Sequence, residues 1–351
     1  IDKQIDPRFR FHMQLSTGAL NNPITNDQDM AGLATTHAFS IAEAYVDYRP
    51  NSRVTLRGGR TEEIFADNAR FLWDDDVRLN GFHQTVRLPI ASNPLGFTSF
   101  ELRAGEYLLT NPAVYVLPAS SPYISAGYQQ GQKVRSSNLF HPGAVLRGNL
   151  GGNWSHQITG TVQLYRNPNQ IQLASTAAGF PVLINGAIGV ALSGAPGGTG
   201  NATTTPGGAL LTAPDYQISH LGYRLERKAV RLAGKDVPAW LDFQVARNHG
   251  AANMRDAFMV SANLGAVRQR GDLRGLYQFA IKDANSMISQ FTDDDLGTGS
   301  GVNIAVHAVR IDLGLTRFLQ WQNLVFFQQQ RRASNASEQF FVPLARGANQ
   351  T

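Results

Sequence analysis

The sequence has no cysteine, and only five of its 31 basic residues are lysines. The first absence excludes disulfides, thiolate metal sites and haem attached through a C-x-x-C-H motif. The second leaves 26 arginines, which are spread along most of the chain rather than gathered in a block. Nucleic-acid binders usually concentrate basic residues in a patch with interleaved aromatic side chains, so nucleic acid is not an expected partner.

Long hydrophobic runs are also absent. Helices that cross a bilayer need about 20 consecutive apolar residues, and the chain of 351 residues, 42% of them hydrophobic, contains no such run. Motifs for a nucleophilic serine or for a phosphate-cradling loop are missing too, and no histidines have the spacing of zinc ligands. We therefore expect no catalytic residues, no enzyme activity, no cofactor and no metal site.

The chain instead shows a regular alternation of apolar and polar residues. Residues 8–17 give the clearest case: Phe9, Phe11, Met13 and Leu15 alternate with polar side chains. Successive side chains on a strand point to opposite faces, so this segment has one apolar and one polar face. A soluble sandwich hides the apolar face in a core, whereas a membrane barrel turns it to lipid and directs the charges into its lumen.

The connections between strands favour the barrel. The pattern predicts thirteen strands, at residues 8–17, 39–49, 53–61, 78–88, 98–109, 139–149, 156–167, 216–232, 238–249, 256–267, 273–286, 302–316 and 321–332. Short and long connections alternate between them, with 250–255 the one short connection on the long side. Short periplasmic turns and longer extracellular loops are typical of outer-membrane barrels. We expect a transmembrane antiparallel β-barrel, all-β, as a single domain over residues 1–351.

Several motifs near the start resemble the bacterial putative-porin family. These are residues 45–50 (YVDYRP), 55–60 (TLRGGR) and 71–76 (FLWDDD), with 15–18 (LSTG) and 21–23 (NNP) before them. They cover about the first ninety residues. The family usually has Asn-Pro-Phe after Gly-Gly-Arg, whereas this chain has Glu62-Glu63-Ile64-Phe65. The resemblance implies an outer-membrane pore and two further strands before residue 8.

Barrels of this class have even strand numbers. The pattern allows fourteen strands, or sixteen if Gln4 to Pro7 form a periplasmic turn, and the resemblance favours sixteen. The last five residues have a loop-like composition, whereas such barrels commonly end in a strand that closes on an aromatic residue. We therefore expect a fragment that lacks N-terminal strands and the closing C-terminal strand.

Strand parity assigns a set of charged residues to the lumen. Because arginines and acids that face each other across a pore set its ion preference, the excess of bases predicts a weak anion preference. The alternative is that these side chains only hydrate and stiffen the wall. The predicted pore-lining residues are Arg8, Arg10, Arg53, Arg57, Arg103, Arg224, Arg274, Lys282, Arg310, Glu43, Asp47, Glu101, Glu226, Asp242 and Asp312.

Two kinds of loop segment stand out. Residues 168–215 form the longest connection and contain an apolar run at 180–192. Long structureless loops are usually functional or disordered, so this loop is expected either to constrict the lumen or to form a lid outside it. Acid runs at 74–76 and 293–295 could hold calcium, but solvated charge or pairing with arginine is the favoured interpretation.

The leading functional prediction is a porin of the bacterial outer membrane, open to passive diffusion of small hydrophilic solutes or ions. Outer-membrane lipid and solutes are the expected partners, with a homo-oligomer possible. Three alternatives remain open: a structural barrel that sheathes a partner such as an electron-transfer cytochrome, an outer-membrane barrel enzyme, and a soluble β-protein.

Overall fold

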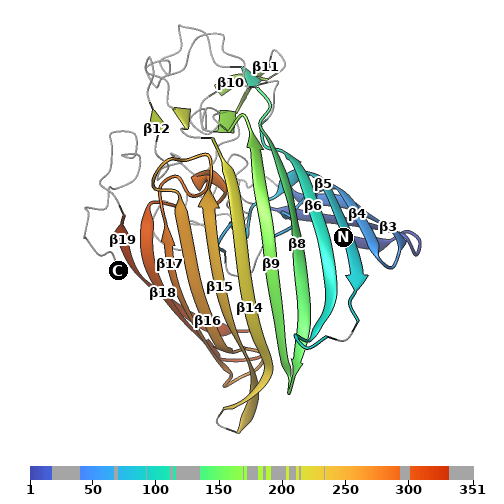
Figure 1. Ribbon diagram of the computed structural model, residues 1–351, viewed down its shortest axis with the longest axis vertical. Coiled ribbons are helices and arrows are strands. Elements are labelled where there is room, and N and C mark those ends of the chain that lie inside the picture. Colours follow the sequence, from blue (N-terminus) through green and yellow to red (C-terminus); the bar gives the residue numbers. More distant parts are fainter. Residues whose placement is uncertain are drawn as a thin grey trace.

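Fourteen strands form one antiparallel sheet in the computed structural model (Figure 1), and this confirms the predicted all-β class. The structure describes residues 1–17, 40–66, 70–91, 93–110, 135–168, 170–171, 215–232, 234–292 and 301–331, together with the backbone of five short strands elsewhere. Each strand pairs with the next in the sheet, in the order β1-β2-β3-β4-β5-β6-β8-β9-β14-β15-β16-β17-β18-β19.

The strands of this sheet are β1 (Asp2–Gln4), β2 (Phe9–Ser16), β3 (Ser40–Asn51), β4 (Val54–Thr61), β5 (Leu79–Pro89), β6 (Phe97–Leu108), β8 (Asn138–Gly151), β9 (Trp154–Arg166), β14 (Gln217–Leu232), β15 (Lys235–Asn248), β16 (Asp256–Gly265), β17 (Leu273–Lys282), β18 (Ile304–Gly314) and β19 (Gln320–Gln330). The short strands β7 (Val114–Tyr115), β10 (Pro181–Ile184) and β11 (Ala187–Val190) pair separately, as do β12 (Thr203–Thr204) and β13 (Leu211–Thr212). A 3-10 turn, η3, covers Ser289–Phe291.

All thirteen predicted strands are present, with bounds that differ by a few residues. The fourteenth is β1, which forms a hairpin with β2 and pairs Lys3 with Phe11. The apolar–polar alternation slips at residues 302–308, where a β-bulge would be one explanation, but β18 pairs with both neighbours without a register shift. Ile304 and Val306 are apolar because they face an apolar cluster inside the sheet.

Short and long connections lie at opposite ends of the sheet, as predicted (Figure 1). A two-residue turn joins β8 to β9, where Gly151 pairs with Trp154. The two turn residues, Gly152 and Asn153, have φ values of +55° and +69°. Two successive positive φ values are what a two-residue hairpin turn requires, and glycine and asparagine adopt them at least cost.

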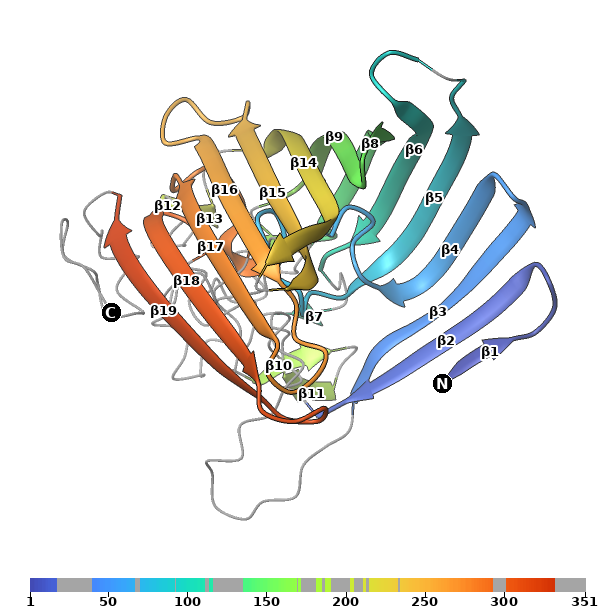
Figure 2. The ribbon, with the colours of Figure 1, turned by 90° about the horizontal axis from the view of Figure 1, so that it is seen from below.

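Seen from below, the sheet curls around an interior (Figure 2). Its order begins at β1 and ends at β19, and within the described part of the chain no pairing joins these two edges. The number of strands in a closed barrel, fourteen or sixteen, therefore remains a prediction. Among the described residues, no helix is long and apolar enough to cross a bilayer.

The outer face of the sheet is apolar and has aromatic residues near both ends. Phe9, Phe97, Trp154 and Trp321 lie near the short turns, and Phe82, Phe140, Phe258 and Phe327 lie near the long loops. On β9, ten residues separate Trp154 from Leu164, the partner of Phe140. At about 3.3 Å per residue and a tilt of about 40°, this separation spans roughly 25 Å along the axis, the height of the apolar band in outer-membrane barrels.

Candidate functional site: the charged interior

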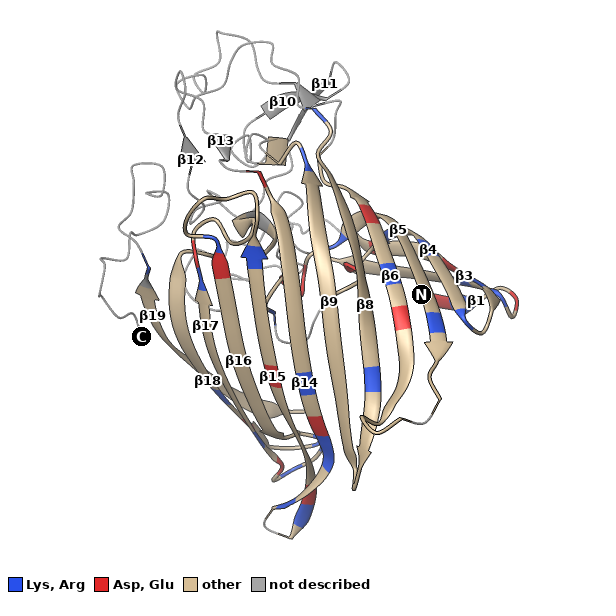
Figure 3. Ribbon diagram, in the orientation of Figure 1, with Lys and Arg blue, Asp and Glu red and all other residues tan. Residues whose placement is uncertain are grey.

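The inner face of the sheet has the opposite character, with ionised side chains in adjacent strands. Figure 3 shows Lys and Arg beside Asp and Glu along β6, β8, β14 and β15. Arg57 on β4 donates to both carboxylate oxygens of Asp47 on β3, at 2.6 and 3.2 Å, and the Asp47 side chain is fully buried. A buried carboxylate needs such a bidentate partner, because burial of an unpaired charge costs several kcal/mol.

The densest cluster surrounds Glu101 on β6. Arg87 on β5, Arg103 on β6 and Arg147 on β8 all form ion pairs with its carboxylate, which is 2% exposed. Arg147 also donates to the side-chain oxygen of Gln157 at 2.9 Å. Three arginines share one glutamate here, so this side of the interior has a surplus of positive charge.

On β14 and β15 the balance is reversed. Arg224 donates to Glu226 at 2.5 Å and lies 3.6 Å from the carboxylate of Asp242, so one arginine serves two acids. Its guanidinium also stacks over the ring of Trp240, 4.3 Å from the centroid. The two clusters therefore give the interior a basic side and an acidic side.

A third cluster lies on β17 and β18, where two arginines share one acid, so that basic side chains are again in excess. Arg310 donates to Asp312 at 2.8 Å, and Arg274 lies 3.5 Å from the same carboxylate. Asp312 is only 2% exposed, whereas both arginines keep part of their surface open.

Most of the predicted pore-lining residues lie on this inner face, but three of them need comment. Arg8 and Arg53 are exposed and lie in turns beyond the ends of β2 and β4, not on a strand. Lys282 is on the inner face but fully buried, with its ammonium 3.5 Å from the carbonyl of Arg70 and 5.7 Å from the centre of the Phe71 ring. The parity pattern missed Arg147, whose segment (Ala144-Val145-Leu146-Arg147) gives no clear alternation.

Arg87 was also missed, although its alternation with Val86 and Leu88 could have revealed it. That the remaining predicted residues line an open path for solutes stays a prediction. These residues are Arg10, Arg57, Arg103, Arg224, Arg274, Arg310, Glu43, Asp47, Glu101, Glu226, Asp242 and Asp312.

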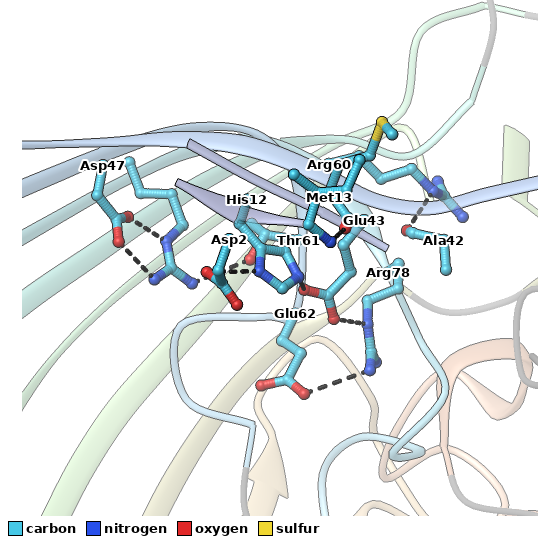
Figure 4. Close-up of polar contacts among 12 residues, drawn as sticks. Asp2, His12, Met13, Ala42, Glu43, Asp47, Arg60, Thr61, Glu62 and Arg78 are labelled. Atoms are coloured by element: carbon cyan, nitrogen blue, oxygen red, sulfur yellow. Dashed lines mark hydrogen bonds and ion pairs between the residues drawn. The ribbon is translucent and has the colours of Figure 1, made fainter. Parts of the chain in front are cut away.

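Near the first strands, a chain of ionisable side chains leads from the wall to an interior loop (Figure 4). His12 on β2 lies between Asp2 and Glu43, with ring nitrogens 3.1 and 3.4 Å from their carboxylates. Nε of Arg78 pairs with Glu43 in turn, and Nη2 of Arg78 lies 3.3 Å from the carboxylate of Glu62. The loop after β4 is thereby tied to the inner face of β3.

That loop and the one after β17 fold inward and meet. We call residues 62–66 and 70–78 the first inward segment and residues 283–292 the second. The amide of Asp74 donates to the carbonyl of Phe291 at 2.9 Å, and the rings of Trp73 and Phe291 lie 5.9 Å apart. Trp73 is 2% exposed. These contacts close an apolar cluster inside the sheet at the end with the long loops.

The inner wall is apolar where this cluster rests. Met259 and Ala280 are fully buried, and Ile304 and Val306 are 1% exposed, all on inward-facing positions. Each large apolar side chain removed from water contributes on the order of 2 kcal/mol, so the inward segments are held by packing as well as by polar contacts.

Glu63 anchors the first inward segment through a buried polar network. Its Oε1 lies 2.7 Å from Nδ1 of His141 on β8 and accepts a hydrogen bond from the hydroxyl of Tyr107 on β6 at 3.1 Å. The Tyr107 hydroxyl in turn accepts from the amide of Ile64 at 2.8 Å and lies 2.9 Å from Nε2 of His83. Because the single hydroxyl proton goes to Glu63, His83 must be the donor in the last contact.

Glycines on the wall make room for these anchors. An alanine Cβ at Gly105 would lie 2.3 Å from the hydroxyl of Tyr107, and one at Gly143 would lie 2.9 Å from Cζ of Phe65. Real Cβ atoms do not approach so closely, so both glycines are needed for the observed packing. Local alternation does not predict this arrangement, since it depends on the orientation of the Tyr107 ring and on where Phe65 packs.

A polar cavity of about 260 Å³ lies beneath the first inward segment, bounded by Phe65 and Ala66 and by the inner faces of β6, β8, β9, β14 and β15. Its charged and amide side chains include Arg103, Arg147, Gln157, Arg224, Glu226 and Asp242. Both clusters of opposite charge balance therefore contribute to one cavity.

Two sequence predictions about loops remain open. Of residues 168–215, most lie outside the described part of the chain, so neither a constriction nor a lid can be assigned there; the acid run 293–295 lies outside it as well. At 74–76, the carboxylate oxygens lie within 4.8 Å of one another. Asp75 pairs with Arg70, and Asp74 accepts from the amide of Asp76 at 2.8 Å, so these acids serve the loop's own structure.

The comparison with known protein families gives a match in the same N-terminal part of the chain that contains the motifs. Residues 1–138 match the family described as "Putative porin". No curated protein matches the chain. Among solved structures, it is similar to OmpTdeltaL8, a loop L8 deletion mutant of OmpT, an outer membrane protein of Vibrio cholerae; the TM-score is 0.39 and the identity 8%, over 93% of this chain and 82% of that one. The family match confirms the resemblance seen in the motifs: residues 1–138 of this chain are similar to the putative porin family.

Proposed function

We propose that this protein is an outer-membrane channel for passive diffusion of small hydrophilic solutes or ions, with a weak preference for anions. One observation carries the proposal: the sheet is apolar outside and carries partly exposed ionised side chains inside, as at the Glu101 cluster. A polar, charged interior in an apolar wall keeps water and solutes solvated across a bilayer. Members of a porin family are typically not enzymes, and the interior clusters are ion pairs between wall residues.

The sign of the preference comes from the charges on the inner wall. Of the predicted set, Arg8 and Arg53 lie in turns, while Arg87 and Arg147 join the wall. The set therefore keeps nine basic side chains against six acidic ones. Surplus charge of one sign in a pore raises the local concentration of counter-ions, which here are anions.

The inward segments favour a pore over a sheath for a partner protein. A sheath needs an open interior, whereas the chain's own Trp73 and Phe291 pack together inside the sheet at the end with the long loops. A channel narrowed by its own loops passes small solutes and excludes folded proteins, which agrees with the size of the polar cavity beneath Phe65.

Planar-bilayer recording of the purified protein tests the proposal. We expect stepwise conductance, and a reversal potential in a salt gradient that indicates anion preference at about 0.1 M salt and weakens near 1 M, where the screening length falls from about 10 Å to about 3 Å. Detergent carried through the same purification without protein is the control. Folded protein that gives no conductance steps would overturn the pore, and cation preference at low salt would overturn the selectivity alone.

A further inference from the structure

The cavity beneath the first inward segment has two sides of opposite charge. On one side Arg87, Arg103 and Arg147 surround Glu101, three positive charges with one negative charge, which leaves a formal +2. On the other side Arg224 forms ion pairs with Glu226 and Asp242, one positive charge beside two negative ones. Arg103, Arg147, Glu226 and Asp242 all line the cavity.

Strand register places these groups in one row across the wall. Arg147 pairs with Gln157, Gln157 with Arg224, and Arg224 with Asp242. Neighbouring strands lie about 4.8 Å apart, so three intervals put the backbones of Arg147 and Asp242 roughly 14 Å apart. Side chains reach inward from both ends of this row over a concave surface, and the space left between the charged groups is shorter than that.

Within this cavity, the charge pattern disfavours tight binding of an ion of a single sign, whichever ions pass through the pore. A simple anion drawn to Arg147 meets Glu226 and Asp242, and a simple cation drawn to Asp242 meets the arginines. A solute with a carboxylate at one end and an ammonium at the other satisfies both sides, and each contact is stronger in a partly buried site than in water. Two extended residues span about 7 Å, which suits the row.

We propose that this cavity binds zwitterions of dipeptide size, with the carboxylate on the Arg103–Arg147 side and the ammonium on the Glu226–Asp242 side. The inference deepens the proposed pore function, since it names the solute class that the interior favours. Binding itself can be measured on the folded protein whether or not that protein conducts.

The test compares three probes by calorimetric titration of the folded full chain in detergent. Glycylglycine carries both charges, N-acetyl-glycylglycine lacks the ammonium, and glycylglycinamide lacks the carboxylate. Each lost charged contact should weaken binding about ten-fold, the size of one charge-assisted hydrogen bond. Equal binding of the three probes, or binding of none, overturns the proposal, and this comparison needs no variant.

Variants assign the two ends. Arg147→Gln should weaken glycylglycine about ten-fold and leave glycylglycinamide nearly unchanged, while Asp242→Asn should affect glycylglycine and spare the acetylated probe. Arg147→Lys keeps the charge and should restore most of the binding. Arg231→Gln is the matched control, because Arg231 is 71% exposed and pairs across its turn with Asp236 at 3.4 Å. Unaltered discrimination among the probes in both cavity variants contradicts the assignment.

Conductance separates this inference from the proposed function. A protein that binds glycylglycine selectively but forms no channel retains the zwitterion site and loses the pore. A protein that conducts while treating the three probes alike retains the pore and loses the zwitterion site.

Discussion

Nδ1 of His141 lies 2.7 Å from Oε1 of Glu63, although 78 residues separate them in the chain. Glu63 belongs to the first inward segment and His141 to β8, so this contact joins a loop to the wall. Both side chains are almost completely buried, at 1% and 0% exposure. The position of the first inward segment therefore depends in part on a small number of polar contacts that single substitutions can remove.

Replacement of Glu63 should release the first inward segment. In Glu63→Ala, the contacts to His141 and Tyr107 are lost and their polar groups remain buried without that partner, which costs about 1–3 kcal/mol. We expect single-channel conductance to rise and the thermal unfolding temperature to fall. Glu62→Ala is the control, since the Glu62 side chain is 56% exposed and its carboxylate lies 3.3 Å from Arg78 of the same segment. Conductance that stays at the wild-type value would show that this anchor does not set the width of the channel.

The glycine beneath Tyr107 gives an independent route to the same anchor. In Gly105→Ala, the new methyl group would lie 2.3 Å from the Tyr107 hydroxyl and 2.6 Å from its ring, so the ring must move away from Glu63. Overpacking of this kind costs roughly 1–3 kcal/mol, measured as a lower midpoint of urea unfolding. Gly160→Ala has nothing within 4 Å of the new atom and should change stability by less than about 0.5 kcal/mol. Equal effects of the two substitutions would contradict the packing argument.

Charge reversal at the Glu101 cluster should change ion selectivity. Arg103→Glu with Arg147→Glu alters the wall charge by −4, so the reversal potential at low salt should shift from anion toward cation preference, and the shift should shrink as salt rises. Arg231→Glu with Arg227→Gln, near the short turns, is expected to have a smaller effect. A double variant that folds and keeps the wild-type reversal potential would exclude this cluster from the ion path.

The faces of the sheet can be tested with spin labels. Labels at Leu241 and Phe243, which are 44% and 43% exposed on the outer face, should be accessible to oxygen dissolved in lipid. A label at Gly222, which pairs with Gln244 on the inner face, should be accessible to a water-soluble relaxing agent. The reverse accessibilities would be incompatible with the proposed orientation in the membrane.

Asp272 lies in the turn between β16 and β17. The ammonium of Lys235, at the start of β15, and the amides of Arg268 and Gln269 lower the pKa of Asp272 below its ordinary value of 3.8. Because the pKa is lowered, the ionised carboxylate contributes fully to turn stability at pH values above its ordinary pKa. That contribution is lost as the pH falls through the lowered pKa. An NMR titration of the Asp272 carboxyl carbon should show the shift. Lys235→Gln should move the midpoint back toward 3.8; no movement would exclude the ion pair as the main cause.

Local alternation by itself determined the strands, their faces and the asymmetry of the turns. Each depends on residues close in sequence: a period of two fixes which side chains share a face, and Gly152-Asn153 adopts the positive φ values of a two-residue turn. That is why all thirteen predicted strands appear, and why acids and arginines such as Asp47 and Arg57 lie on the same face.

Only the tertiary structure decided which segments enter the interior and which charges meet there. The alternation pattern predicted that residues 168–215 constrict the lumen or form a lid, and it did not predict that residues 62–66, 70–78 and 283–292 enter the interior. They do so because Glu63 finds its partners on β6 and β8 and Trp73 packs on Phe291. The apolar positions Ile304 and Val306 disturbed the alternation for the same reason: they pack against these segments. Such contacts depend on sheet curvature and on the register of distant strands, and neither is encoded in a local pattern.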